Sequence, residues 1–313
     1  MCSSDLLERA QGAWLPCMQQ NSAGTMTLRR AYKGTLFADL ECVGGEWGGT
    51  RDARHVWAGN SAWIDAPMMR LVRALGTLFD DDQRLTLDGL EEKLEPPVKA
   101  DSPEVRALER LFVDNPNWEA NMLANLNVAS FKGGKRLSDH LAYYMVGGTI
   151  NVQGIQGGYQ GPGFYTNMPG HARAKIDIRF PPGVTPLEVA DLVTAHLNRR
   201  GHEHVKLRNF RGYSGAQALP EEDDTLLQAA RQTAEMHGVN ISVWPIANNC
   251  CPSSLLTNLG KQIPFSIAGI GHGDRAHAPD EYITVGSVAL LMHWTVDYLY
   301  AWAAVMAHRS ATD

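Results

Sequence analysis

The sequence predicts an α/β protein that carries an inserted α+β domain. Between about residues 32 and 212, segments of strand, helix, strand, strand, helix and strand character follow one another. This order is typical of a split βαβ sandwich, in which two helices cover one face of an antiparallel sheet. After Gly212, helical and strand segments alternate, which indicates an α/β unit.

Hydrophobic periodicity identifies the elements of the inserted domain. Strands are expected where apolar and polar residues alternate, and helices where apolar residues recur every three or four positions. The first strand ends at Gly44-Gly45, the strand from His171 is stopped by Pro181-Pro182, and Thr185-Pro186 opens the second helix. The expected strands are 32–43, 149–153, 171–180 and 205–210, and the expected helices are 64–78 and 185–199.

The C-terminal segment is predicted to hold helices at 221–237 and 253–259, strands at 240–244 and 264–268, and a long helix from about residue 284. These strands are too few for an independent sheet, so we expect them to pair with a segment from elsewhere. Residues 1–30 show no convincing period. Residues 80–146 are helical and polar in pattern and are interpreted as an insertion.

Composition excludes several classes of protein. The chain has 313 residues, of which 44% are hydrophobic and 20% are charged, and its net charge of −6 without a basic stripe gives no reason to expect a nucleic-acid partner. Five cysteines, an odd number without paired spacing, predict free thiols in a reducing, cytoplasmic compartment. The apolar stretch Val285 to Met306 is interrupted by His293 and Asp297, so we expect a buried amphipathic helix and no membrane span.

One loop has the composition of a ligand site. Residues 268–282 follow an apolar segment and contain several glycines, two histidines and a Pro before two carboxylates. Glycine allows a close approach of backbone and ligand, Pro279 stiffens the exit, and neutral imidazole is the commonest protein ligand of transition metals. His277 is therefore a candidate metal ligand. The glycine-rich segment 154–163 does not form a nucleotide-binding GxGxxG motif.

Several motifs together resemble a known family. Gly269-Ile270-Gly271-His272-Gly273 leading to Ala276-His277-Ala278-Pro279-Asp280-Glu281 looks like the last metal-ligand loop of the dinuclear zinc exopeptidases and amidohydrolases. This family includes acetylornithine deacetylase, succinyl-diaminopimelate desuccinylase, carboxypeptidase G and the carnosinase-like dipeptidases. Arg54-His55, Gly157-Gly158-Tyr159 through Pro169, and Ile176-Asp177-Ile178-Arg179 also match in the family's order.

The resemblance implies roles for six residues. His277 would be the terminal imidazole ligand of one of two zinc ions, with Glu281 orienting the loop behind it. His55 would correspond to the lid histidine that reaches across a homodimer and hydrogen-bonds the oxyanion in the partner's site. Thr166 or Asn167 and Arg179 would hold the free carboxylate of the substrate.

The resemblance also implies a domain order. Residues 1–31 would be a remnant of the catalytic domain, 32–212 the lid and dimerisation domain with the helical insertion at about 80–146, and 213–313 the C-terminal part of the catalytic α/β domain. The family's remaining ligands and its catalytic glutamate lie in an N-terminal half that has no counterpart here, and no Asp or Glu occurs between Glu8 and Asp39. We therefore expect a truncated or split protein that needs an N-terminal-half polypeptide.

Three functions remain open at the level of sequence. The first is a zinc-dependent metallopeptidase or amide hydrolase in which a metal-activated water attacks a peptide or N-acyl amide bond. The second is a catalytically inactive scaffold or regulator that dimerises through the lid. The third is a small-molecule binding module that uses the lid groove and Arg179.

Overall fold

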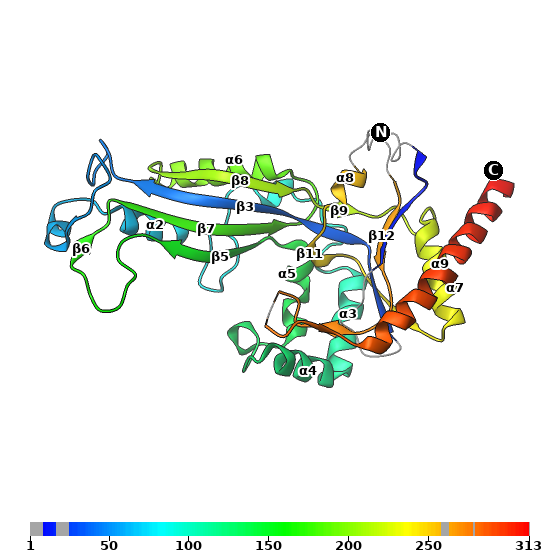
Figure 1. The fold of residues 1–313 in the computed structure, drawn as a ribbon. Coiled ribbons are helices and arrows are strands. Elements are labelled where there is room, and N and C mark those ends of the chain that lie inside the picture. Colours follow the sequence, from blue (N-terminus) through cyan, green and yellow to red (C-terminus); the bar gives the residue numbers. More distant parts are fainter. Residues whose placement is uncertain (1–8, 17–24, 258–262, 278, 313) are drawn as a thin grey trace. The chain divides into compact units, whose positions relative to one another are not determined.

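The computed structural model describes residues 9–16, 25–257, 263–277 and 279–312, and the chain divides into two compact units (Figure 1). The first unit comprises 1–32, 97–141 and 216–313, and the second comprises 33–96 and 142–215. The sequence predicts that 80–146 is an insertion in the lid domain; in the structure, residues 97–141 group with the first unit. One reason is aromatic packing, because the ring of Phe112 lies edge-on to Trp244 at 5.9 Å.

The second unit is built on four antiparallel strands. β3 (Ala31–Val43) pairs with β7 (His171–Phe180) on one side and with β8 (Val205–Tyr213) on the other, and β5 (Thr149–Gln156) pairs with the far edge of β7. Two helices, α2 (Pro67–Leu75) and α6 (Pro186–Arg199), share one buried cluster with the strands. The predicted α/β class and the strand and helix order of this domain are confirmed.

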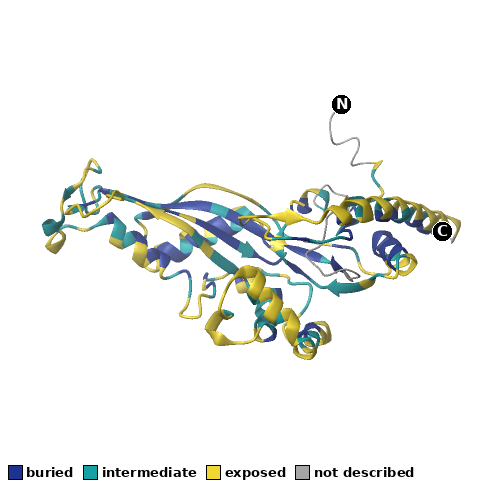
Figure 2. Ribbon diagram, turned by 60° about the horizontal axis from the view of Figure 1, so that its bottom comes forward, coloured by how far each residue is buried: buried dark blue, intermediate teal, exposed yellow. Residues whose placement is uncertain are grey.

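Alternation along the strands separates the two faces of this sheet. Leu36 and Leu40 of β3 join Ile176 and Ile178 of β7 in the buried cluster beneath the helices, which Figure 2 shows in dark blue. The residues between them point to the opposite face, away from α2 and α6. That face carries the polar side chains of the candidate site.

Local signals in the sequence start α6 where it was predicted. Thr185 accepts a hydrogen bond from the backbone of Glu188, whose carboxylate in turn accepts from the backbone of Thr185, and Pro186 occupies the first turn. This capping box satisfies two backbone donors at the helix start. Val189, Val193 and Leu197 then recur on the buried side of the helix.

The first unit contains two parallel strand pairs. β1 (Ala13–Pro16) pairs with β12 (Phe265–Ala268), and β2 (Thr25–Arg29) pairs with β10 (Asn240–Trp244). Residues 1–30 show no convincing period in the sequence, yet two strands lie there. Four- and five-residue strands give little periodicity, and each of these finds its partner more than two hundred residues further along the chain.

Two helices close the core of the first unit. α7 (Thr225–Met236) packs on α9 (Val285–Thr312), where Leu226, Trp294 and Tyr298 are fully buried with Met26 of β2. α9 was predicted to be a buried amphipathic helix, and it is buried along one side, at Trp294, Tyr298 and Ala301, while Met292, Val296 and Tyr300 are more than half exposed. Among the described residues, no helix is both long and apolar enough to cross a membrane.

The remaining elements are short or lie in the segments between these cores. They are β4 (Val56–Trp57), η1 (Ala58–Ala62), η2 (Glu91–Lys93), α3 (Pro103–Asp114), α4 (Pro116–Leu126), η3 (Lys132–Gly134), η4 (Leu137–His140), α5 (Leu141–Val146), β6 (Asn167–Met168), β9 (Ala216–Gln217), β11 (Ala247–Cys250), α8 (Ser254–Thr257), β13 (Gly273–Asp274) and β14 (Tyr282–Ile283). Cys42, Cys250 and Cys251 have free thiols, and Cys2 and Cys17 lie outside the described residues.

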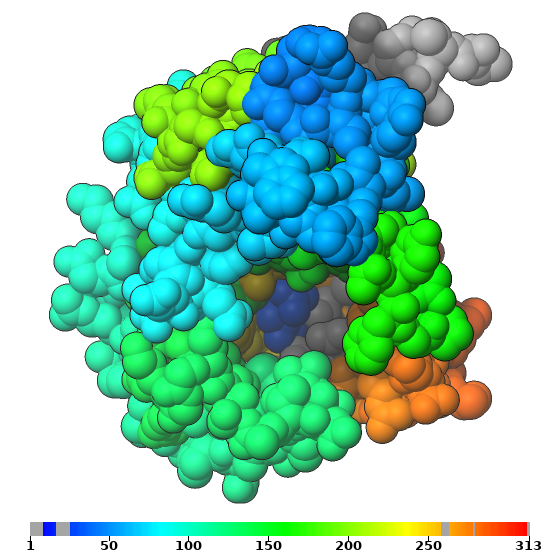
Figure 3. All heavy atoms as spheres, turned by 90° about the vertical axis from the view of Figure 1, so that its left-hand side faces the viewer, coloured from blue at the N-terminus to red at the C-terminus, as the bar shows by residue number. Residues whose placement is uncertain are grey.

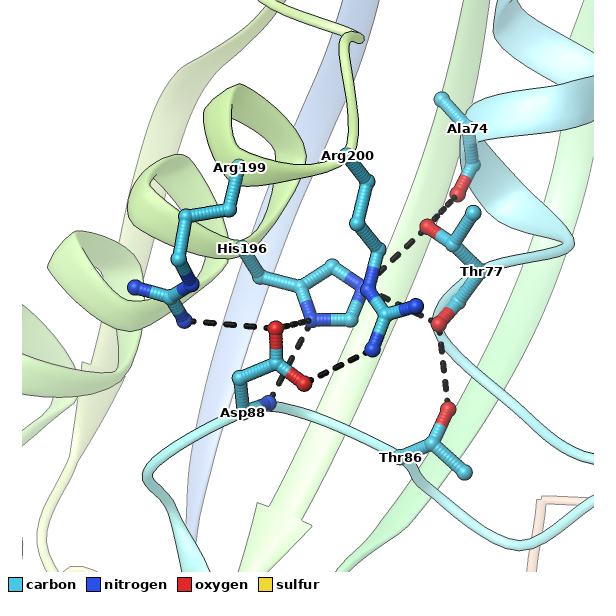
Figure 4. Close-up of polar contacts among 7 residues, drawn as sticks. All are labelled: Ala74, Thr77, Thr86, Asp88, His196, Arg199 and Arg200. Atoms are coloured by element: carbon cyan, nitrogen blue, oxygen red, sulfur yellow. Dashed lines mark hydrogen bonds and ion pairs between the residues drawn. The ribbon is translucent and has the colours of Figure 1, made fainter.

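A buried histidine joins α6 to the segment after α2 (Figure 4). The Nε2 atom of His196 lies 3.0 Å from the carbonyl oxygen of Thr77, and its Nδ1 atom lies 3.1 Å from Oδ2 of Asp88. Arg199 and Arg200 also bind the carboxylate of Asp88. Burial lowers the pKa of His196, and the charge of Asp88 opposes this shift only in part.

The lowered pKa of His196 predicts how stability depends on pH. The unfolded chain binds the proton more tightly than the folded chain, so the free energy of unfolding should rise with pH from the lowered pKa up to about 6.5 and level off above it. The pKa of His202 is lowered by burial too, so His196→Gln should flatten the rise without abolishing it. Urea unfolding across this range checks the prediction, with the exposed His293→Gln as control. An unchanged slope in His196→Gln would contradict it.

Candidate functional site

Two short strands bring three of the predicted site residues together in the second unit. β4 pairs with β6 in antiparallel register, with Trp57 opposite Asn167, and the backbone N–H of Ala58 donates to the carbonyl oxygen of Thr166 at 3.0 Å. His55 immediately precedes β4 and is exposed. His55, Thr166 and Asn167 therefore lie at one end of the sheet, where β3 ends and β7 begins.

Close backbone packing fixes the loop that carries His55. The N–H of Gly44 donates to the carbonyl oxygen of Gly170 at 2.9 Å, which closes the loop against the start of β7. A Cβ atom on Gly170 would lie 2.2 Å from the carbonyl oxygen of Ala53, so only glycine fits there. Beside His55, Arg54 binds Asp52, and this hydrogen bond lowers the pKa of the Asp52 carboxyl.

Arg179 lies at the other end of β7. It is eight residues beyond His171, which corresponds to roughly 26 Å along a strand. Its Nε atom is 3.6 Å from Oδ1 of Asp177, and Asn151 and Gln153 of β5 each donate to Oδ2 of Asp177 at 2.9 Å. The buried carboxylate of Asp177 thus holds Arg179 in place. Arg179 and His55 lie at opposite ends of β7, so they are far apart within a single copy of the second unit.

The same open face contains a polar cleft of about 290 Å³ between His55 and Arg179 along β7. Its floor is Asp39, which is 5% exposed and accepts hydrogen bonds from Arg173 and Asn209. Burial acts to raise the pKa of Asp39, but these two hydrogen bonds and the charges of Arg173 and Lys175 outweigh it and lower the pKa. Asp39 is therefore a charged structural anchor of this face.

The loop with the candidate metal ligand is a hairpin in the first unit. β13 pairs with β14, with Asp274 opposite Tyr282, and His277 lies in the connecting turn. Arg275, His277 and Asp280 have φ values of 63°, 63° and 60°, in the left-handed region that non-glycine residues seldom adopt. Such strain is common at functional turns. The side chains of His277 and Glu281 are exposed.

The described part of the chain does not by itself fit a zinc site. No group of three or more His, Cys, Asp or Glu side chains converges among the described residues, whereas a zinc ion in a hydrolase takes about three protein ligands. His277 and Glu281 supply at most one corner of such a site. No step of a reaction can therefore be derived through a metal from these residues alone.

Comparison with known proteins identifies the class of protein to which this fold belongs. Residues 62–205 match the family described as "Peptidase dimerisation domain" of the M20 peptidases. The chain carries this domain and has the M20 metallopeptidase fold, so the resemblance to the zinc exopeptidases is confirmed.

Individual relatives are dipeptidases and carboxypeptidases. Over 137 residues the chain is 27% identical to the Beta-Ala-His dipeptidase of Mus musculus, a match that covers 43% of this chain and 26% of that protein. The structure of an M20 family metallo-carboxypeptidase from Sulfolobus solfataricus superposes with a TM-score of 0.71 at 20% identity, covering 92% of this chain and 63% of that one. The di-peptidase Dug1p from Saccharomyces cerevisiae gives a TM-score of 0.70 at 17% identity, covering 96% and 62%.

The chain spans less than two thirds of the length of these relatives. At identities of 17–20%, the structural matches establish the fold. They do not establish the activity, the substrate or the partners of this chain.

Two features of the candidate site were missed at the level of sequence. Asp177 is the buried partner of Arg179. It precedes Arg179 by two residues in a strand, so the sequence already indicated that the two side chains lie next to each other on one face. The hairpin of β13 and β14 was read as a plain loop, although Gly273 and Tyr282 bracket the turn. Two-residue strands are too short to give a periodic pattern.

The tight approach at Gly170 gives a testable prediction. Gly170→Ala should lower the free energy of unfolding of the second unit by about 1–3 kcal/mol, because the new methyl group must displace the backbone at Ala53. Chemical denaturation measures this change. Gly154→Ala is the matched control, since an added Cβ there meets nothing within 4 Å and should be neutral. Equal stability of the two variants would show that the loop yields without cost.

Proposed function

We propose that this chain is part of a metal-dependent hydrolase of the exopeptidase and amidohydrolase type, acting on a peptide or N-acyl amide bond. The observation that carries the proposal is the peptidase dimerisation domain at residues 62–205, set within a chain that has the M20 metallopeptidase fold. Matches to proteins named as dipeptidases and a carboxypeptidase support the choice of a small peptide or N-acyl amino acid as substrate.

The metal would be zinc, held in this chain by His277. The strained turn that presents the imidazole supports this role, and Glu281 would orient the turn. The other ligands and the general base would come from an N-terminal-half segment, since the relatives are longer than this chain and the described residues lack a complete ligand set. The chain would therefore have two protein partners, which are this segment and a second copy of the chain.

A homodimer would reconcile the positions of His55 and Arg179. About 26 Å of β7 separates them, too far for both to contact one small substrate in the same second unit. His55 would instead serve the partner's site, where its N–H can donate to an oxyanion, and Thr166 or Asn167 beside it would add a polar contact. We also propose that the protein lies in the cytoplasm. The free thiols of Cys42, Cys250 and Cys251 support this location, because the cytoplasm is a reducing compartment.

Arg179 would recognise the free carboxylate of the substrate. Its side chain is 39% exposed, and the carboxylate of Asp177, which accepts hydrogen bonds from Asn151 and Gln153, lies beside it, so the guanidinium is oriented before substrate arrives. A guanidinium binds a carboxylate with paired hydrogen bonds, and such charge-assisted bonds contribute about 1.5–3 kcal/mol.

Substitution of Arg179 tests this role in the protein completed by an N-terminal-half polypeptide. Arg179→Ala should lower kcat/KM for a dipeptide about 10- to 100-fold and leave the rate for the same substrate with an amidated C-terminus almost unchanged. Arg208→Ala, an exposed arginine on β8, is the matched control. Equal losses for both substrates would show that Arg179 does not read the carboxylate.

Hydrolysis itself distinguishes this function from a scaffold. The completed protein should bind zinc and release the amino acid from a dipeptide or an N-acyl amino acid. A completed protein that dimerises, and hydrolyses neither substrate with zinc or another divalent metal, would establish the dimerising scaffold instead. The dimerisation domain alone is compatible with either role.

A further inference from the structure

The polar cleft on the sheet of the second unit is lined by more positive than negative charge. Its volume is about 290 Å³, which lies at the lower end of the range for small-molecule sites. The whole chain has a net charge of −6, so a local excess of cations does not follow from the composition. We call this site the basic cleft; its charged and amide side chains are Asp39, Gln153, Arg173, Lys175, Asn209 and Arg211.

Two β-bulges shape the basic cleft. The register between β5 and β7 shifts at Gln153, and the register between β3 and β8 shifts where Asn209 lies, at a φ of 48° in the left-handed region. Each bulge turns an amide side chain toward this face of the sheet. Asn209 donates to Asp39 and Gln153 donates to Asp177, each at 2.9 Å. Bulges that redirect side chains in this way are frequent beside functional sites.

The cations of the basic cleft exceed what its floor requires. Arg173 and Lys175 of β7 both bind the carboxylate of Asp39, the only acidic group among the described residues that line the cleft. Arg211 of β8 forms no ion pair within the described part of the chain, and its guanidinium lies 6.0 Å from the ring centroid of Phe37. Three cations facing one carboxylate leave an excess of two positive charges.

One donor in the basic cleft also lacks an acceptor. The Nε atom of Arg173 is buried and has no hydrogen-bond partner among the described residues, although another nitrogen of the same guanidinium binds Asp39. A buried N–H without a partner is costly. An anion in the cleft would let the guanidinium turn this N–H onto an oxygen atom.

The positions of the cations favour a phosphate group over a carboxylate. β3 lies between β7 and β8, so Arg211 approaches the cleft from the side opposite to Arg173 and Lys175. A phosphate group carries nearly two negative charges at neutral pH and presents three acceptor oxygens, whereas a carboxylate is planar and carries one charge. Two charges match the excess in the basic cleft.

We infer that the basic cleft binds a phosphate group, either as inorganic phosphate or as a small phosphate monoester. The ring of Phe37 lines the cleft and would pack against the organic part of a monoester. The site is distinct from the proposed contact of Arg179 with the substrate, because Arg179 lies four residues beyond Lys175, roughly 13 Å along β7.

The site is also separate from the loops at the far end of the sheet. Figure 3 looks onto the end of the chain with the loops 44–66, in blue, and 157–168, in green. None of the residues that line the basic cleft comes from these loops. Phosphate binding therefore does not depend on how these loops contact other molecules.

Calorimetric titration of the full chain tests the inference without measuring hydrolysis. The probes are inorganic phosphate and phenyl phosphate, at about pH 7.5 and a constant ionic strength of about 0.15 M. One site per chain with a Kd below about 1 mM is expected for at least one probe. Binding of phenyl phosphate at least about 10-fold tighter than that of inorganic phosphate would assign the site to a monoester, and equal binding would assign it to the free ion.

Two substitutions locate the site. Lys175→Gln and Arg211→Gln should each weaken phosphate binding about 10- to 100-fold, because each removes a charge-assisted hydrogen bond. Both side chains are exposed, so the far-UV circular dichroism spectrum should stay unchanged. The matched control is Arg208→Gln, which removes the same charge from the same strand outside the cleft and should change the Kd no more than about threefold.

Three results would overturn the inference. The first is a wild-type chain that binds neither probe. The second is equal weakening by Arg208→Gln and Arg211→Gln, which would show that phosphate responds only to the overall charge of the face. The third is a loss of binding in Arg179→Ala with unchanged binding in Arg211→Gln, which would place the phosphate at Arg179.

Discussion

The pairing of β3 with β7 is the constraint on which the second unit depends. Gly34 to Val43 run antiparallel to Phe180 to His171 without a break in register, although more than a hundred residues of chain separate them. A one-residue slip would turn every inward side chain of β7 to the opposite face. The pairing therefore fixes at once which side chains form the core and which form the polar face.

Buried charges on the polar face reinforce that register. Asp39 and Asp177 are almost completely buried on the side of the sheet opposite α2 and α6, and each is satisfied by several donors from neighbouring strands. A buried carboxylate without partners would be costly, so only the native register keeps both charges compensated. The same contacts hold Arg179 in one orientation, which links the stability of the sheet to the presentation of a candidate binding residue.

Two different devices present the candidate functional histidines. His55 follows a loop that is held by the close approach of Gly170 to Ala53 and by a two-residue strand pair. His277 lies in a turn where three residues other than glycine adopt left-handed backbone angles. In both cases the backbone fixes the position of the residue, and the side chain is exposed and available to groups from another segment or another copy.

The sequence by itself determined the elements with a long, regular period. β3, β7 and α6 were predicted within a residue or two, because alternation over ten or more residues and a capping box are local signals. The motifs around His55, Arg179 and His277 also sufficed to indicate the family. Only the tertiary structure decided the rest. β1 and β2 are strands because distant partners pair with them, residues 97–141 join the first unit through packing such as that of Phe112 on Trp244, and the distance between His55 and Arg179 follows from the length of β7. These features depend on contacts between residues far apart in the chain, which no local pattern encodes.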